Sequence, residues 1–310
     1  MNEKVFQKLR SEGPLKILIV SQKGGVGKST LSANFSAYCG RILKRKTVLL
    51  DCDPHASASM WLKALRPENV EVKHHLIDDF TAQRWFIGMR NVIRKNLTGC
   101  EFLVCDLTWT KSMSAEFVKE FDLIVIPTSV SLIEIDATNI FIEQNLKKIS
   151  KMSPGISTPD LLICPSQVID DELKLNPFNS RTFDFPFFLL PPIPCDPEIR
   201  SLFEKGYAFE TNDVTATAYK KVFESILQAG RLKKGKYVES CARQDPRLSS
   251  SKLDINERKQ ARKVNHKTTI HDTNNVGSVW KDSHQVDKVK KILKLKKKEK
   301  SSWLRRLVSW

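Results

Sequence analysis

The sequence predicts a doubly wound α/β domain with a mostly parallel sheet and helices on both faces. Short runs of apolar and β-branched residues recur along the first two thirds of the chain, and helix-length segments separate them. None of these runs alternates with polar residues. Continuous apolar strands of this length are typical of a parallel sheet that is covered on both faces. With 310 residues, 41% of them hydrophobic, the chain can also bury a core of its own.

The expected elements alternate as strand and helix with short connections, which is the order of a doubly wound sheet. Strands are predicted at residues 15–20, 47–50, 102–105, 123–126 and 161–164. Helices are predicted at residues 29–43, 56–65, 114–120, 135–152, 197–205 and 215–228. Six prolines between residues 166 and 197 exclude a long regular helix, so we expect an irregular segment there. Its aromatic residues should pack back on the domain: Phe183, Phe185, Phe187 and Phe188.

The charge is distributed unevenly along the chain. Residues 231–310 hold 23 Lys and Arg against 8 Asp and Glu, or +15 of the net charge of +16. We therefore expect an N-terminal extension (1–14), a near-neutral globular domain (15–230), a basic disordered linker (231–285) and a lysine-rich amphipathic segment (286–310). The sequence shows neither a secretory signal nor an apolar run long enough to cross a bilayer, which predicts a cytoplasmic protein.

The strongest motif is a glycine-rich loop between the first strand and the first helix. It reads Lys23-Gly24-Gly25-Val26-Gly27-Lys28-Ser29-Thr30. Glycines let successive backbone N–H groups point at phosphate oxygens, and the helix N-terminus adds partial positive charge. Lys28 would reach the β- and γ-phosphates, and the Ser29 hydroxyl would bind Mg²⁺. The whole run is therefore predicted to bind a nucleotide.

Lys23 to Ser29 match, residue for residue, the K-G-G-x-G-K-[ST] motif of the deviant Walker A ATPases, the ParA/MinD group. The resemblance extends over about residues 15–228. It implies a P-loop NTPase fold. It implies ATP and Mg²⁺ as cofactors and a homodimer in which Lys23 crosses the interface to the partner's nucleotide. A charge supplied in this way acts as an arginine finger does, so turnover would depend on dimerisation.

The resemblance also assigns roles to three carboxylates. Asp51 and Asp53 match the D-x-D-P segment after the second strand, where Asp53 would position or activate the attacking water and Asp51 would lie in the Mg²⁺ shell. Taken alone, these two residues could equally be turn and cap residues before Pro54. Asp106 is the Walker B candidate for Mg²⁺. Two departures stand out: His55 replaces the Gln of many relatives, and Asp106-Leu107-Thr108-Trp109 replaces D-T-P-P or D-x-x-G.

Contacts outside the phosphate loop follow from the resemblance alone. Pro194 and Asp196 fall where relatives place the loop against the adenine ring. Non-specific DNA binding by the ATP-bound dimer would use basic residues near the last helices: Arg200, Lys205, Lys220 and Lys221. The catalytic set would then be Lys23, Lys28 and Asp53. Trp109 could be a core aromatic or an interface residue.

The family implies a slow ATPase whose partner protein, ParB-like or other, stimulates hydrolysis and so positions plasmid, chromosome or protein cargo. An alternative is a MinD-like organiser of the membrane surface, because Trp303, Leu307 and Trp310 fall at helical spacing beside many Lys and Arg. That segment also suits DNA or a solvated tail without a partner. A metabolic or redox enzyme on the same scaffold is a third alternative, and a relative that does not hydrolyse ATP is a fourth.

Overall fold

The computed structural model describes residues 13–76, 85–110, 113–152, 158–169, 183, 185–211 and 213–244. Its centre is a seven-stranded sheet with the order β3-β2-β4-β1-β5-β6-β7, and every described pair of neighbours is parallel. The strands are β1 (Leu15–Ser21), β2 (Thr47–Asp51), β3 (Val70–His74), β4 (Phe102–Thr108), β5 (Leu123–Thr128), β6 (Asp160–Pro165) and β7 (Phe187–Leu189). The predicted parallel sheet is confirmed.

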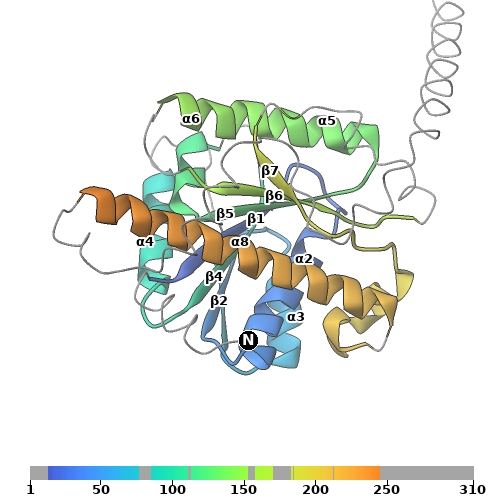
Figure 1. The fold of residues 1–310 in the computed structure, drawn as a ribbon. Coiled ribbons are helices and arrows are strands. Elements are labelled where there is room, and N and C mark those ends of the chain that lie inside the picture. The colour runs from blue at the N-terminus through green and yellow to red at the C-terminus, as the bar shows by residue number, and fades with distance from the viewer. Residues whose placement is uncertain are drawn as a thin grey trace, which may run out of the picture.

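Helices cover both faces of this sheet, as Figure 1 shows. One core is formed with α2 (Lys28–Ala37), α3 (Ser57–Leu65) and α8 (Val214–Gln244), and the other with α4 (Trp85–Asn96), α5 (Leu132–Phe141) and α6 (Lys148–Met152). Successive strand residues enter opposite cores, so Leu18 and Ile19 are both fully buried. Short π-helices and 3₁₀-helices complete the layers: η1 (Tyr38–Ile42), η2 (Ala115–Glu120), η3 (Ile142–Lys147), η5 (Pro197–Leu202) and η6 (Ala208–Glu210).

Two strands and one α-helix were missing from the sequence prediction. The edge strand β3 alternates valine with exposed Glu71 and Lys73, so it lacks the continuous apolar run of the central strands. Helix α4 buries only Trp85, Met89 and Ile93, which follow one another at four-residue spacing along one face of the helix. Strand β7 lies in the segment that was interpreted as irregular. The aromatic residues of that segment do pack on the domain, as expected.

Helix α8 corrects the predicted domain boundary. It runs to Gln244, whereas the sequence predicted a helix ending at residue 228 and a linker from residue 231. Lys233 and Lys234 were counted as linker charge, but they are buried and form ion pairs of 3.3 Å with Asp160 and 3.2 Å with Asp122. Lys233 and Lys234 therefore belong to the globular domain, and the helix that carries them continues to Gln244. The predicted N-terminal extension, except residues 13 and 14, and everything predicted for 245–310 lie outside the described residues.

Candidate nucleotide site

The site lies where β1, β2 and β4 end. These strands are neighbours, and their register sets Ile19 of β1 and Asp51 of β2 opposite Asp106 of β4. The chain leaves β1 into the glycine-rich loop and leaves β2 into the Asp53 turn. In an open parallel sheet, ligands bind in the crevice at the carboxyl ends of the strands. The predicted phosphate loop and the predicted carboxylates therefore meet at one edge of the sheet.

Two glycines give the loop its shape. Gly25 and Gly27 both have φ of 83°, in the left-handed region where residues with a Cβ are strained. Gly27 is also the residue before α2, and its carbonyl accepts the first helical bond, from Leu31 N at 2.9 Å. Gly24 and Gly25 are exposed, Val26 is buried, and Ser29 and Thr30 are half-buried in the first helical turn. The free N–H groups of this helix end form a site for anions such as phosphate.

Side chains outside the loop hold its carbonyl groups. Ser166 Oγ, after β6, donates to Val26 O at 2.7 Å, and Gln167 Nε2 donates to Gly25 O. Ser21 Oγ donates to Lys23 O at 2.8 Å. Fixing a carbonyl on one side of a peptide fixes the N–H on the other side. Sequence reasoning missed Ser166 and Gln167, because they come from a distant strand and carry no motif.

Lys28 lies between two carboxylates. Its Nζ donates to Asp53 Oδ2 at 3.0 Å and to Asp106 Oδ1 at 2.9 Å, and all three residues are buried. It also lies 3.3 Å from Ser29 Oγ. Burial by itself lowers the pKa of Lys28, but Asp106 and Asp53 more than offset this, so the pKa is raised. The ammonium group therefore stays charged at neutral pH.

The two carboxylates differ in their protonation behaviour. Burial raises the pKa of Asp53, but hydrogen bonds from Thr108 and His55 N and the charge of Lys28 lower it to about 2. The pKa of Asp106 is raised by complete burial, against the opposing charge of Lys28. Ser32, one helical turn after Lys28, also donates to Asp106 Oδ1 at 3.0 Å. Sequence reasoning missed Ser32, although its position four residues after Lys28 places it on the same helix face.

The donor set around Asp106 fits a magnesium ion that also binds phosphate. Asp106 Oδ2 is buried and has no hydrogen-bond partner within the described ranges. The described residues contain no cluster of three or more His, Cys, Asp or Glu that could hold a metal by itself. Mg²⁺ commonly takes one or two protein oxygens and completes its shell with substrate phosphates and water. Ser29 and Asp106 could supply those protein oxygens.

Asp51 has a structural role in this arrangement. Its Oδ1 accepts from Asp53 N at 3.0 Å, and its Oδ2 accepts from Ser59 N at 2.8 Å in the first turn of α3. A carboxylate at a helix N-terminus is favourable because the N–H groups there lack partners. This is the turn and cap role that the sequence left open, while the water-mediated contact to Mg²⁺ stays a prediction.

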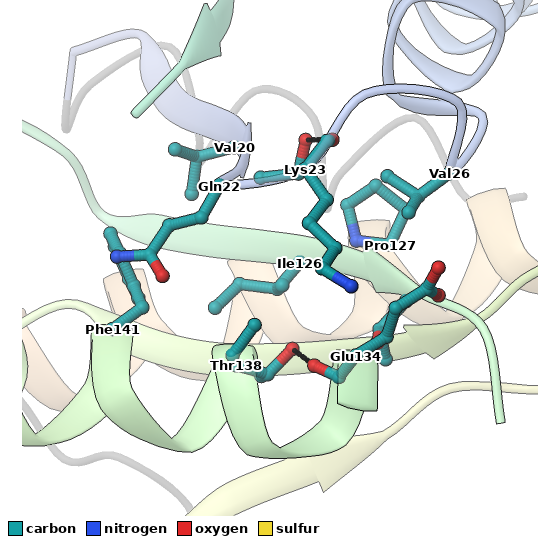
Figure 2. Close-up of a pocket in the computed structure, with 12 residues that line it drawn as sticks. Val20, Gln22, Lys23, Val26, Ile126, Pro127, Glu134, Thr138 and Phe141 are labelled. Carbon is teal, nitrogen blue, oxygen red and sulfur yellow. Dashed lines mark hydrogen bonds between the residues drawn. The ribbon is translucent and has the colours of Figure 1, made fainter. Parts of the chain in front are cut away.

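Lys23, the first residue of the glycine-rich loop, faces α5. It is half-buried and lines a pocket of about 20 Å³ together with Ile126 and Pro127 of β5 and Glu134 and Thr138 of α5. Figure 2 shows its side chain extending from the loop toward that helix. A volume of this size admits about one water molecule, so the pocket is not a nucleotide site. Lys23 does not join the Lys28 cluster within its own chain.

The departures from the family pattern have clear structural effects. Thr108 Oγ1 donates to Asp53 Oδ2 at 2.5 Å, and His55 N donates to Asp53 Oδ1 at 3.0 Å, while the His55 side chain is exposed. Trp109 is 4% exposed and its ring meets Phe141 edge-on at 5.3 Å, so it is a core aromatic. Extending the strand alternation by two residues would have placed Thr108 on the side of Asp106.

The remaining predicted contacts lie away from this cluster. Pro194 is half-buried and forms an isolated β-bridge with Val168. Both carboxylate oxygens of Asp196 accept hydrogen bonds from nearby groups, Glu198 N at 2.9 Å and Thr215 Oγ1 at 2.9 Å. Their contact to adenine stays a prediction. The four basic residues predicted to bind DNA are all exposed, on η5, the following turn and α8: Arg200, Lys205, Lys220 and Lys221.

Comparisons with known proteins agree with this fold. A local match of 40% identity over 63 residues, 20% of this chain and 25% of the relative, links it to an uncharacterised protein of Borreliella burgdorferi. The fold resembles a proposed plasmid partition protein from Borrelia burgdorferi B31 bound to AMPPNP, with TM-score 0.55, 14% identity, and 69% and 99% of the two chains covered. It also resembles the cell division ATPase MinD of Pyrococcus furiosus, with TM-score 0.51, 20% identity, and 69% and 98% covered.

A family model identifies the domain. The model of the CobQ/CobB/MinD/ParA nucleotide binding domain matches residues 17–276, which is more than half of the chain. That span contains the glycine-rich loop, Asp53 and Asp106. The chain belongs to the CobQ/CobB/MinD/ParA nucleotide-binding domain family.

Proposed function

We propose that this chain is a ParA-like ATPase that dimerises on ATP, binds DNA non-specifically and hydrolyses ATP slowly to position a plasmid, chromosome or protein cargo. One observation carries the proposal: Lys28 and the carboxylates of Asp53 and Asp106 meet at the start of α2, directly after the glycine-rich loop. Such a loop and helix end bind phosphate, and a buried lysine with two carboxylates supplies the charges that phosphoryl transfer needs.

Each residue of the cluster has a role in this proposal. Backbone N–H groups from Gly24 to Thr30 and the Lys28 ammonium bind the phosphates of ATP. Asp53 orients a water molecule whose oxygen bonds to the γ-phosphorus while the bond to the β–γ bridging oxygen breaks, giving ADP and phosphate. Ser29 and Asp106 would hold Mg²⁺, which when bound offsets the negative charge of the phosphates.

Lys23 is proposed to act on a second copy of the chain. Its half-buried side chain extends toward α5 and does not join the Lys28 cluster of its own chain. A lysine that completes the site of a partner would make turnover depend on dimerisation. Such a dimer, assembled on ATP and released on hydrolysis, is a switch between two nucleotide states.

The proposed DNA contact rests on exposed charge. Arg200, Lys205, Lys220 and Lys221 are exposed near η5 and the start of α8, where phosphates of DNA could reach them. Binding through phosphates releases counterions, so affinity should fall steeply with salt. We propose that the protein works in the cytoplasm on the nucleoid, with a ParB-like or other partner that stimulates hydrolysis.

The test is ATP turnover and DNA co-sedimentation of the full chain and of a version truncated after Gln244, each with ATP, ADP or no nucleotide. Truncation at this residue keeps the ion pairs of Lys233 and Lys234, which a cut after Gly230 would remove. ATP-dependent DNA binding that survives truncation is the expected result. Failure to bind or hydrolyse ATP would contradict the proposal.

A second candidate is a MinD-like organiser of the membrane surface. Tryptophan and leucine lie at helical spacing beside two arginines in the last ten residues, directly after a lysine-rich stretch, and such a face suits an anionic bilayer. No helix in the ranges that the structure describes is long and apolar enough to cross a membrane. Liposome binding that requires ATP and is lost on truncation, without DNA binding by the core, would favour this candidate over the first.

A further inference from the structure

Strand β4 continues past the Walker B aspartate. Its register with β1 runs on to the pair Ser21 and Thr108, two residues after Asp106. Side chains of a strand alternate between its two faces. Accordingly Leu107 and Trp109 enter the core on the α5 side, whereas Asp106 and Thr108 contact the residues of the site. The residues after Asp106 are therefore an ordered strand end.

Trp109 fixes this strand end. Its backbone N–H donates to Ser21 O at 2.8 Å, and its buried ring packs edge-on against Phe141 of α5 at 5.3 Å. Edge-to-face aromatic pairs of this kind add stability beyond the area they bury. Thr108 is thus held between a paired strand and an anchored tryptophan, so its hydroxyl has a defined position.

The Thr108 hydroxyl determines how the Asp53 carboxylate is oriented. Three donors reach that carboxylate: Thr108 Oγ1 at 2.5 Å and Lys28 Nζ at 3.0 Å on Oδ2, and His55 N at 3.0 Å on Oδ1. A carboxylate accepts about four hydrogen bonds, two at each oxygen, so one position remains on Oδ1. That position is where a water molecule could be bound.

Two side chains bind the Asp53 carboxylate, those of Thr108 and Lys28, and they differ in whether they bind other groups as well. Lys28 also binds Asp106, and under the proposed function it contacts phosphate. The Thr108 hydroxyl has no other hydrogen-bond partner in the part of the chain that the structure describes. We propose that Thr108 is a positioning residue that holds Asp53 for the attacking water, a role that depends on the ATPase function proposed above.

The test compares Thr108→Val, which removes the hydroxyl with little change in volume, with Thr108→Ser, which keeps it. Thr47→Val is the matched control, because the Thr47 hydroxyl is also hydrogen-bonded, to Arg45 O, but lies at the opposite end of the sheet. For each variant we would measure kcat for ATP, the Kd for ADP and the thermal unfolding midpoint.

We expect T108V to lower kcat about ten- to a hundredfold, because a small misplacement of a catalytic group costs this much. The Kd for ADP should stay within about twofold, and T108S should restore kcat to within about threefold of wild type. T47V should turn over at the wild-type rate. A T108V protein that is folded and hydrolyses ATP as fast as wild type, or faster, would overturn the role of Thr108 and leave the ATPase proposal intact. A wild-type chain that binds no nucleotide would instead overturn the proposed function itself.

Discussion

Buried lysines pair with aspartates at both ends of the sheet, and the two ends differ in charge balance. At the amino ends of β5 and β6, Lys233 and Lys234 meet Asp160 and Asp122, two cations against two anions. At the carboxyl ends of β2 and β4, Lys28 alone meets Asp53 and Asp106. The charges of the first four side chains sum to zero, and their ion pairs hold α8 to the sheet. The second end has excess negative charge, which a bound cation would balance.

The largest effect is expected from removing the lysine at the unbalanced end. Lys28→Met should lower ATP turnover about a hundred- to a thousandfold, because a preorganised charge at the phosphates is lost. Turnover measured under saturating ATP and Mg²⁺ checks this, with Lys95→Met as a control at an exposed position on α4. A K28M protein with turnover within about tenfold of wild type would show that Lys28 is not needed for hydrolysis.

Removing the lysines at the balanced end should act on stability instead. Lys233→Met with Lys234→Met leaves Asp160 and Asp122 without these partners, and we expect the free energy of unfolding to fall by about 3 kcal/mol. Urea unfolding measures this, and Lys221→Met should change it by less than about 0.5 kcal/mol. ATP affinity should stay within about twofold of wild type. Loss of affinity without loss of stability would show that the two ends are not independent.

The stability of the Lys28 end of the sheet should depend on pH, because the pKa of Asp53 is lowered to about 2 from 3.8. A carboxyl group whose pKa is lower in the folded state contributes stability above its unfolded pKa and loses that contribution as the pH falls through the folded pKa. The advantage of wild type over Asp53→Asn in free energy of unfolding should therefore shrink by about 2 kcal/mol between pH 5 and pH 2. An advantage that is constant across this range would contradict the lowered pKa.

The smallest effect concerns the support of the phosphate loop. Ser166→Ala removes the hydrogen bond to Val26 O, and we expect ADP to bind about fivefold more weakly, in line with about 1 kcal/mol for one hydrogen bond. Isothermal titration with ADP measures it. Ser225→Ala is the control, since Ser225 Oγ also donates to a backbone carbonyl, that of Lys221, but at an exposed position within α8. Equal affinities of S166A and S225A for ADP would show that Ser166 does not support nucleotide binding.

The sequence predicted the parts of the molecule that follow from local pattern. Central strands such as β1 and β5 are buried on both faces, so their apolar runs are continuous, and the glycine-rich loop combines backbone and charge signals in one short motif. It did not predict α8 beyond residue 230, because Lys233 and Lys234 are read as solvent-exposed until their partners in distant strands are known. Thr108 and Ser166 were missed for the same reason: their partners lie more than fifty residues away.

The most direct test of the central claim is the Mg²⁺ dependence of ATP binding, measured by titration of wild type and Asp106→Asn with and without Mg²⁺. We expect Mg²⁺ to tighten ATP binding to wild type by about tenfold or more and D106N to lose most of this gain, because Asp106 Oδ2 is buried in the site and has no hydrogen-bond partner within the described ranges. ATP binding that Mg²⁺ strengthens equally in both proteins, or no ATP binding by folded wild type, would contradict the account.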